Sequence, residues 1–146
     1  MSPSKHLWLR AESKPFEHRS ALTPVTAKAL LDAGFQITVE KSTQRCFLDE
    51  EFSCIGCTLA QEFSWPQAPA DAYILALKEL PENENFPLHH THIYFAHCFK
   101  YQPDWKKVLE RFRQGNGTLL DLEFLQNEQG KRVASFGHMA GFVDVP

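Results

Sequence analysis

Two short segments of the chain are apolar at nearly every position. They are residues 72–77 (AYILAL) and 92–96 (HIYFA). Both are shorter than an ordinary helix, and their bulky apolar side chains suit a strand that is buried on both faces. Such strands are typical of parallel sheets that are covered on both sides by helices. The sequence therefore predicts an α/β fold with a mainly parallel sheet.

Helices and strands alternate along the rest of the chain. Further strands are expected at 6–10, 35–40 and 118–122, with a short extended piece at 132–136, and helices at 24–33, 48–52 and 103–114. The first helix has Thr23 as its N-cap, Pro24 at its first position and Gly34 as its stop. The last helix places apolar side chains on one face and ends before Gly115. Residues 65–69 are expected to form a loop.

Length and charge indicate one soluble domain. The chain has 146 residues, of which 43% are hydrophobic, and a net charge of -3. This balance gives no reason to expect nucleic acid or an anionic membrane as a partner. No apolar run approaches the roughly 20 residues that a membrane helix needs, and the start lacks a signal-peptide pattern. We expect an intracellular, cytoplasmic protein.

A metal site is one interpretation of the cysteines and histidines. Cys54 and Cys57 have the spacing of a redox motif or of half a zinc site, and LHHTH (residues 88–92) offers His89, His90 and His92 as the other half. A zinc site needs four ligands in tetrahedral geometry and a supporting shell, which nothing else in the sequence supports. We therefore expect no metal, buried or half-buried thiols at the four cysteines, and surface histidines.

Titratable residues follow four of the expected strands. Lys78 and Glu79 follow 72–77, His97 follows 92–96, Glu123 follows 118–122, and Glu12, Lys14, Glu17 and Arg19 follow 6–10. In open α/β sheets, ligands bind in the crevice beyond the carboxyl ends of the strands. One lysine at a strand end most often extends to water, but four such segments favour a site.

The residue types at this edge suggest proton transfer on a carboxylate-bearing substrate. Histidine titrates near neutrality, and lysine becomes a base when its surroundings lower its pKa. Together, Lys78 and His97 offer an acid and a base. Arg19 provides a planar guanidinium that suits a carboxylate. A small amine or carbonyl compound with a carboxylate fits this set.

Five motifs carry a family resemblance. They are LRAESKPFEHRSALTP, LKELPENENFP, FAHCFKYQPDW, GTLLDLEFL and GKRVASFGHMAGF, in order between Leu7 and Phe142. Together they resemble the fungal NAD-dependent, L-lysine-forming saccharopine dehydrogenases. The first motif is also similar to alanine dehydrogenase and the NAD-binding subunit of transhydrogenase. The resemblance implies a three-layer, Rossmann-like (flavodoxin-like) domain, the N-terminal domain of an alanine dehydrogenase-like two-domain enzyme.

The resemblance also implies an activity in lysine biosynthesis, the oxidative cleavage of saccharopine to L-lysine and 2-oxoglutarate with NAD. Lys78 would accept the proton of the saccharopine amine, and His97 would serve the hydration and collapse steps. Arg19 would bind a substrate carboxylate. The remaining implied roles are positioning for Lys14 and Glu17, substrate contact for Gln102 and Phe136, NAD contact for Arg132, and electrostatic tuning for Glu79 and Glu123.

The chain departs from the family pattern in two ways. It contains no G-x-G-x-x-G phosphate turn, and after Phe142 it diverges, so residues 1–142 correspond to the N-terminal domain and 143–146 to a divergent end. We expect the substrate-side half, inactive alone, with NAD bound mainly by a domain missing from this chain. Its full-length relatives would be monomers, cytoplasmic or peroxisomal. The alternative is a stand-alone module that binds an amino acid or 2-oxo acid without redox activity.

Overall fold

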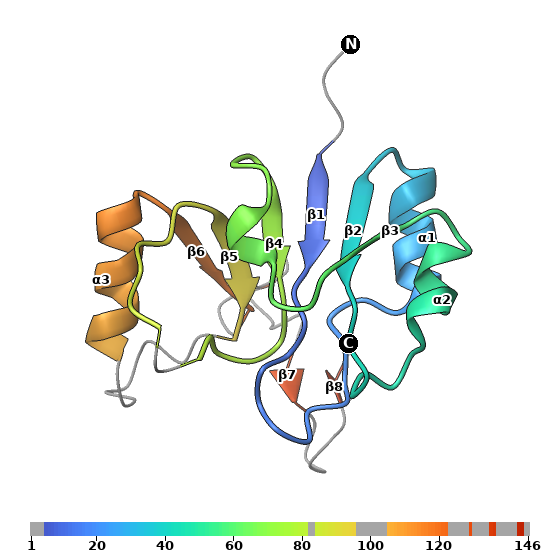
Figure 1. Ribbon diagram of the computed structural model, residues 1–146, viewed down its shortest axis with the longest axis horizontal. Coiled ribbons are helices and arrows are strands. Elements are labelled where there is room, and N and C mark those ends of the chain that lie inside the picture. Colours follow the sequence, from blue (N-terminus) through green and yellow to red (C-terminus); the bar gives the residue numbers. More distant parts are fainter. Residues whose placement is uncertain are drawn as a thin grey trace.

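Six strands form one sheet in the computed structural model of the chain (Figure 1). The structure describes residues 5–81, 84–95, 105–122, 129, 135–136 and 143–144. The strands are β1 (His6–Leu9), β2 (Gln36–Glu40), β3 (Thr58–Ala60), β4 (Tyr73–Leu75), β5 (Thr91–Tyr94) and β6 (Thr118–Asp121). Every pair of neighbouring strands is parallel. The parallel α/β sheet expected from the two apolar segments is therefore confirmed.

The strand order places a topological switch point between β1 and β4. The order is β3-β2-β1-β4-β5-β6, so the chain builds outward from β1 on one side and then restarts at β4 on its other side. Register pairs Leu9 of β1 with Leu75 of β4. At a switch point the two connections leave toward opposite faces of the sheet, and the gap between them is where open α/β sheets bind ligands.

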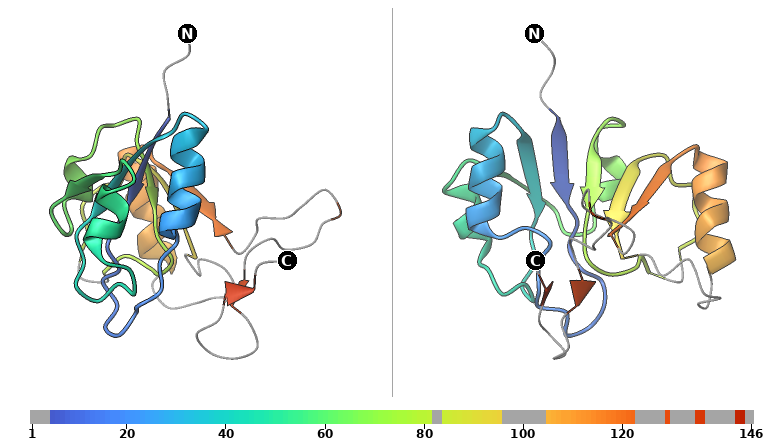
Figure 2. Two further views of the ribbon diagram at one scale, coloured as in Figure 1. Left: turned by 90° about the vertical axis from the view of Figure 1, so that its right-hand side faces the viewer. Right: turned by 180° about the vertical axis from the view of Figure 1, so that it is seen from behind.

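Helices cover both faces of the sheet. Figures 1 and 2 show α1 (Pro24–Asp32) and α2 (Asp49–Ser53) on one side, and α3 (Trp105–Gly115) on the other. Successive strand residues point to opposite faces of the sheet. Leu9 therefore packs in the apolar core on the side of α1 and α2, whereas Trp8 packs in a second apolar core on the side of α3, the α3 core. The expected three-layer, Rossmann-like arrangement is confirmed.

The first helix begins and ends as its sequence predicts. The Thr23 hydroxyl accepts a hydrogen bond from the Thr26 N–H at 3.1 Å, and the Thr26 hydroxyl accepts one from the Thr23 N–H at 2.8 Å. Pro24 occupies the first turn. Gly34 follows the helix with a φ of +101°, a conformation that glycine adopts without strain.

Gly115 has a different role from the expected one. It was expected to follow the helix as its stop, but it is the last residue of α3. Asn116, which follows it, has the positive φ of 57° that ends the helix. A Cβ at position 115 would lie 2.1 Å from the carbonyl oxygen of Leu88. The Leu88 N–H in turn donates to the Arg111 carbonyl at 2.9 Å. Glycine is therefore needed so that two backbones can lie in contact.

Three short elements differ from the expectation. Residues 65–69 were expected as a loop, but Trp65–Gln67 form a 3-10 helix, η1, with Trp65 buried in the α3 core. The three-residue edge strand β3 was not predicted. Near the end, β7 (Ser135–Phe136) falls within the expected extended piece and pairs antiparallel with β8 (Val143–Asp144). None of the helices in the described ranges is long and apolar enough to cross a membrane.

The prediction that the three histidines of LHHTH lie at the surface was wrong for two of them. His89 is exposed, but His90 and His92 are 1% and 0% exposed. The His92 ring packs against Trp65, and the His90 ring is hydrogen bonded to the Ala68 carbonyl oxygen. Among the cysteines, Cys57 is buried but Cys46 and Cys54 are exposed, contrary to expectation, and Cys98 lies outside the described residues.

The two halves of the zinc interpretation lie on opposite faces of the sheet. Cys57 belongs to the core of α1 and α2, whereas His92 contacts Trp65 and Phe112 in the other core. In the ranges that the structure describes, no group of three or more histidine, cysteine or acidic side chains could hold a metal ion.

Candidate functional site

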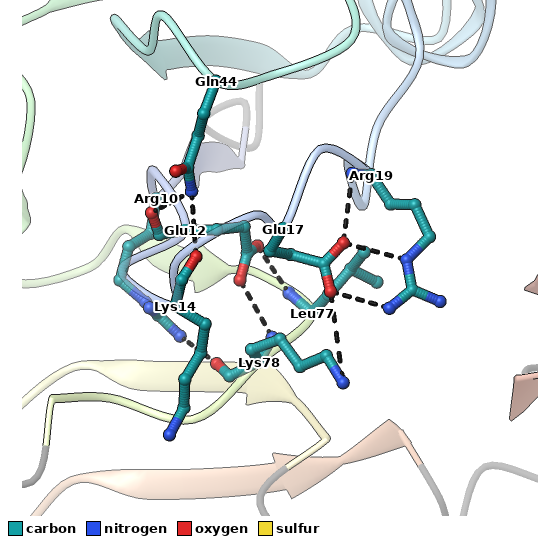
Figure 3. Close-up of polar contacts among 8 residues, drawn as sticks. All are labelled: Arg10, Glu12, Lys14, Glu17, Arg19, Gln44, Leu77 and Lys78. Carbon is teal, nitrogen blue, oxygen red and sulfur yellow. Dashed lines mark hydrogen bonds and ion pairs between the residues drawn. The ribbon is translucent and has the colours of Figure 1, made fainter. Parts of the chain in front are cut away.

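Lys78 lies just beyond the carboxyl end of β4, beside the long loop that follows β1. Both segments meet at the switch point (Figure 1). The Lys78 Nζ atom lies 4.0 Å from Oε1 of Glu17 in that loop, and the lysine side chain is 26% exposed (Figure 3). The expected meeting of the segments after β1 and β4 is therefore observed.

Glu17 also holds Arg19 in a two-point contact. Arg19 Nε donates to Glu17 Oε2 at 2.8 Å, and Arg19 Nη2 donates to Oε1 at 2.7 Å. Burial would raise the pKa of Glu17, but the hydrogen bonds from Arg19 outweigh it and hold the pKa below its ordinary value. Glu17 is therefore an anion at neutral pH, facing two cations. Figure 3 shows the Arg19 Nη1 group directed away from Glu17.

The loop that carries these groups is held by Gln44. Its amide nitrogen donates to the carbonyl oxygens of Glu12 at 2.9 Å and Lys14 at 3.1 Å. The His18 ring in turn bonds the Gln44 carbonyl oxygen at 2.6 Å. These contacts fix the main chain of Lys14, whose side chain is half-exposed. Sequence reasoning missed Gln44, which lies in a polar segment without any motif.

Two further residues were missed as part of the site. Arg10 and Glu12 are 2% and 8% exposed. Glu12 was expected at this edge of the sheet but without a role, and Arg10 was taken as the end of a strand. Both contact the main chain of Lys78. The available signal was two charged residues directly after an apolar strand, RAE in the first motif.

Only part of the expected site falls within the described residues. The structure brings Lys78, Glu17 and Arg19 together, with Lys14 in the same loop. Glu79 follows Lys78 and is half-buried, and Phe136 lies in β7. His97, Gln102, Glu123 and Arg132 lie outside the described residues, so their roles stay predictions.

The switch point is not built for the phosphates of a dinucleotide. In dinucleotide-binding folds the turn after the first strand is rich in glycine, so that backbone N–H groups can approach a pyrophosphate. Here residues 10–22 contain no glycine, and the backbone N–H groups of Leu77 and Lys78 are already bonded to the Glu12 carboxylate. Carboxylates repel phosphate. The two cations beside Glu17 instead suit a ligand that carries a carboxylate.

The family model for the alanine dehydrogenase/PNT N-terminal domain matches residues 8–143. The chain belongs to this family. It is 65% identical over 137 residues to the saccharopine dehydrogenase [NAD(+), L-lysine-forming] of Schizosaccharomyces pombe, which covers 94% of this chain and 37% of that protein. The chain thus spans little more than a third of this relative's length. The resemblance inferred from the motifs is confirmed.

Solved structures of alanine dehydrogenase-like proteins share the fold. An L-alanine dehydrogenase superimposes with a TM-score of 0.70 at 15% identity, over 86% of this chain and 34% of that chain. A transhydrogenase from Sinorhizobium meliloti gives a TM-score of 0.68 at 17% identity, over 84% of this chain and 36% of that chain. These members of the fold support the α/β assignment of the domain.

Proposed function

We propose that this chain is the substrate-side part of an NAD-dependent saccharopine dehydrogenase that forms L-lysine and 2-oxoglutarate. The observation that carries the proposal is Lys78 at the switch point, 4.0 Å from a Glu17 carboxylate that also holds Arg19. Saccharopine is a secondary amine with several carboxylates, so it needs both a proton acceptor and cations. The substrate-side domain would span residues 1–142.

The described side chains divide the work as follows. Arg19 binds a substrate carboxylate at the side of the guanidinium that faces away from Glu17. Lys78 first loses its own proton to solvent and then, as a neutral amine, accepts the proton of the substrate amine. Glu17 balances the positive charge, which would otherwise push the two cations apart. Two further charged residues adjust the electrostatic potential at the substrate amine. They are Lys14, in the loop that Gln44 holds, and Glu79, which follows Lys78.

The other roles are carried over from the family resemblance. His97 serves hydration of the imine and collapse of the carbinolamine, and Gln102 and Phe136 contact the substrate. Glu123 tunes the site, and Arg132 contacts NAD. NAD supplies the hydride acceptor when bound, and in this proposal it is held mainly outside this chain. The full-length enzyme would be a cytoplasmic monomer.

A fusion experiment tests the proposal. Residues 1–142 are joined to the remaining part of the Schizosaccharomyces pombe relative, and NADH formation from saccharopine is measured. We expect an active fusion, with kcat lowered at least about 100-fold by Lys78→Met because the proton acceptor is lost. Arg19→Ala should mainly raise KM. As a control, Lys28→Met removes an exposed lysine that pairs with Asp32 on α1, and should leave both constants unchanged.

Two outcomes would contradict the proposal. If the Lys78→Met fusion kept the activity of the parent fusion, Lys78 would not be the proton acceptor. If the chain bound saccharopine but its fusion never oxidised it, the stand-alone binding module would be favoured. Binding without oxidation would then be explained by Arg19 and Lys78, which both belong to this chain. Turnover by the chain without any added part would show that the missing-half interpretation is wrong.

A further inference from the structure

The peptide group that carries Lys78 is held by two buried side chains of the loop after β1. Glu12 accepts from the Leu77 N–H at 2.8 Å through Oε2 and from the Lys78 N–H at 3.0 Å through Oε1. Arg10 Nη2 donates to the Lys78 carbonyl oxygen at 2.7 Å. Figure 3 shows these contacts at the main chain of Lys78. One anion and one cation of the loop after β1 therefore hold successive main-chain groups after β4.

These contacts begin where the sheet ladder ends. The last main-chain bond between the ends of β1 and β4 runs from Arg10 N–H to the Leu75 carbonyl at 2.9 Å. On the other side, the Phe95 N–H donates to the Leu77 carbonyl at 3.0 Å. With the two side chains added, both N–H groups and both carbonyl oxygens of Leu77 and Lys78 are hydrogen bonded. The backbone at Lys78 is as fully paired as a residue inside a sheet.

We propose that Glu12 and Arg10 are positioning residues that set where the Lys78 ammonium group lies relative to Glu17 and the substrate. The inference rests on the proposed function of Lys78. A lysine side chain has four rotatable bonds, so its amine already has much conformational freedom. Any movement of the main chain at Lys78 would add to that freedom, and a fixed main chain therefore limits where the amine can lie. Small displacements at a proton-transfer site have large effects on rate, which makes such rigidity useful.

Burial argues that Arg10 and Glu12 serve more than stability. Removing an arginine and a carboxylate from water is costly, and a well-packed apolar pair often serves stability as well or better. Arg10 lies 5.5 Å from the Tyr94 ring, measured to the centroid, and its Nε and Nη1 atoms have no hydrogen-bond partner among the described residues. Its one described side-chain hydrogen bond is to the Lys78 carbonyl. A residue chosen for packing alone would not need this contact.

Glu40 provides a matched comparison at the same edge of the sheet. It is 0% exposed, and its carboxylate accepts from Trp8 Nε1 at 2.7 Å and from the N–H groups of Ala11 and Phe63, both at 2.9 Å. None of these described hydrogen bonds reaches β4 or Lys78. Glutamine at position 40 removes the buried charge but keeps one side-chain oxygen, which can still accept from the Ala11 and Phe63 N–H groups, so the main chain between Arg10 and Glu12 stays held.

The test compares Glu12→Gln with Glu40→Gln in the whole chain. The side-chain Cε signal of Lys78 is followed by NMR, and saccharopine binding is followed by calorimetry. We expect Glu12→Gln to move the Lys78 signal and weaken binding about tenfold, since bonds to a charged acceptor are lost. Glu40→Gln should change affinity by less than about twofold. Glu12→Asp, which keeps the charge but is too short to span both amides, should behave like Glu12→Gln and serves if that variant does not fold.

The readouts separate this inference from the proposed function. An unmoved Lys78 signal and parent-like affinity in both Glu12 variants would overturn the positioning role. Equal losses in the Glu12 and Glu40 variants would also overturn it, because the effect would then be structural. If the parent chain binds no saccharopine, the proposed function fails, while a Lys78 signal that moves only in the Glu12 variants still supports positioning.

Discussion

The Nζ atom of Lys78 lies 4.0 Å from Oε1 of Glu17, and the same oxygen accepts a hydrogen bond from Arg19. Removing this charge with Glu17→Gln leaves two neighbouring cations without their shared anion, and the Arg19 side chain loses its two-point contact. We expect saccharopine affinity to fall about tenfold, a loss of about 1.4 kcal/mol, measured by calorimetry.

A matched control for this change lies on α3. Glu110 forms the same kind of two-point contact with Arg113, but on an exposed helix face far along the chain from the site. Glu110→Gln should leave saccharopine affinity unchanged. Equal affinities of the Glu17→Gln variant and the parent chain would show that the shared carboxylate does not organise the site.

Acid should destabilise the chain through His92. Its ring is fully buried between Trp65 and Phe112, and neither ring nitrogen has a hydrogen-bond partner in the described part of the chain. Burial, helped by nearby cations such as Arg10, lowers the pKa of His92 to about 3. Between the ordinary pKa of histidine and this value only the unfolded chain binds the proton, so stability falls as pH falls through this window.

His92→Phe isolates that contribution. Phenylalanine keeps a ring of similar size and cannot be protonated. The advantage of the variant in free energy of unfolding should grow by about 2 kcal/mol between pH 7 and pH 5, measured by urea denaturation at each pH. An advantage that stays constant over this range would mean that His92 is protonated in the folded chain.

Phe16 occupies a backbone position that ordinarily favours glycine. The Glu17 N–H donates to the Lys14 carbonyl at 3.3 Å, which closes a turn with Pro15 second and Phe16 third. Phe16 has a φ of 64° and is 87% exposed, so it has the strain of the left-handed region without much burial. At most positions alanine is more stable than glycine, but here Phe16→Gly should be more stable than Phe16→Ala by about 1 kcal/mol in thermal unfolding. The opposite order would show that the turn is not strained in solution.

The close contact at Gly115 predicts a large loss of stability on adding a single methyl group. Gly115→Ala would place Cβ against the backbone of Leu88, which cannot move without breaking its bond to Arg111. We expect the free energy of unfolding to fall by about 3 kcal/mol. Gly34→Ala, where no atom lies near the added Cβ, tests strain from positive φ alone and should cost less. Equal costs for the two variants would contradict the steric explanation.

Patterns that depend on one segment could be predicted from the sequence. The cap at Thr23 is of this kind and was confirmed in position and type. A strand within residues 72–77 was also confirmed, but β4 spans only Tyr73–Leu75, with Ile74 buried and its two neighbours half-buried. The meeting of Lys78 with Glu17 and Arg19 also followed from the parallel sheet, because its carboxyl ends share one edge.

Features that depend on two distant segments could not be predicted in the same way. Nothing in the order of residues shows that the Arg10 and Glu12 side chains turn inward to bond the Lys78 backbone, or that Gln44 reaches back to the loop. The burial of His92 was missed although it begins the apolar segment 92–96, because it was grouped with His89 and His90, and histidines are usually found at a surface. Here it lies on the face of β5 that meets Trp65, which depends on how η1 packs.

Calorimetric titration of the folded chain with saccharopine tests the central claim most directly. The Arg19→Ala variant is measured beside the parent chain. Arg113→Ala, which changes an exposed arginine on α3, is the matched control. We predict that the parent chain and the Arg113→Ala variant bind saccharopine, and that Arg19→Ala does not. Equal binding by all three, or no binding by a parent chain that circular dichroism shows to be folded, would contradict a substrate site carried by this chain.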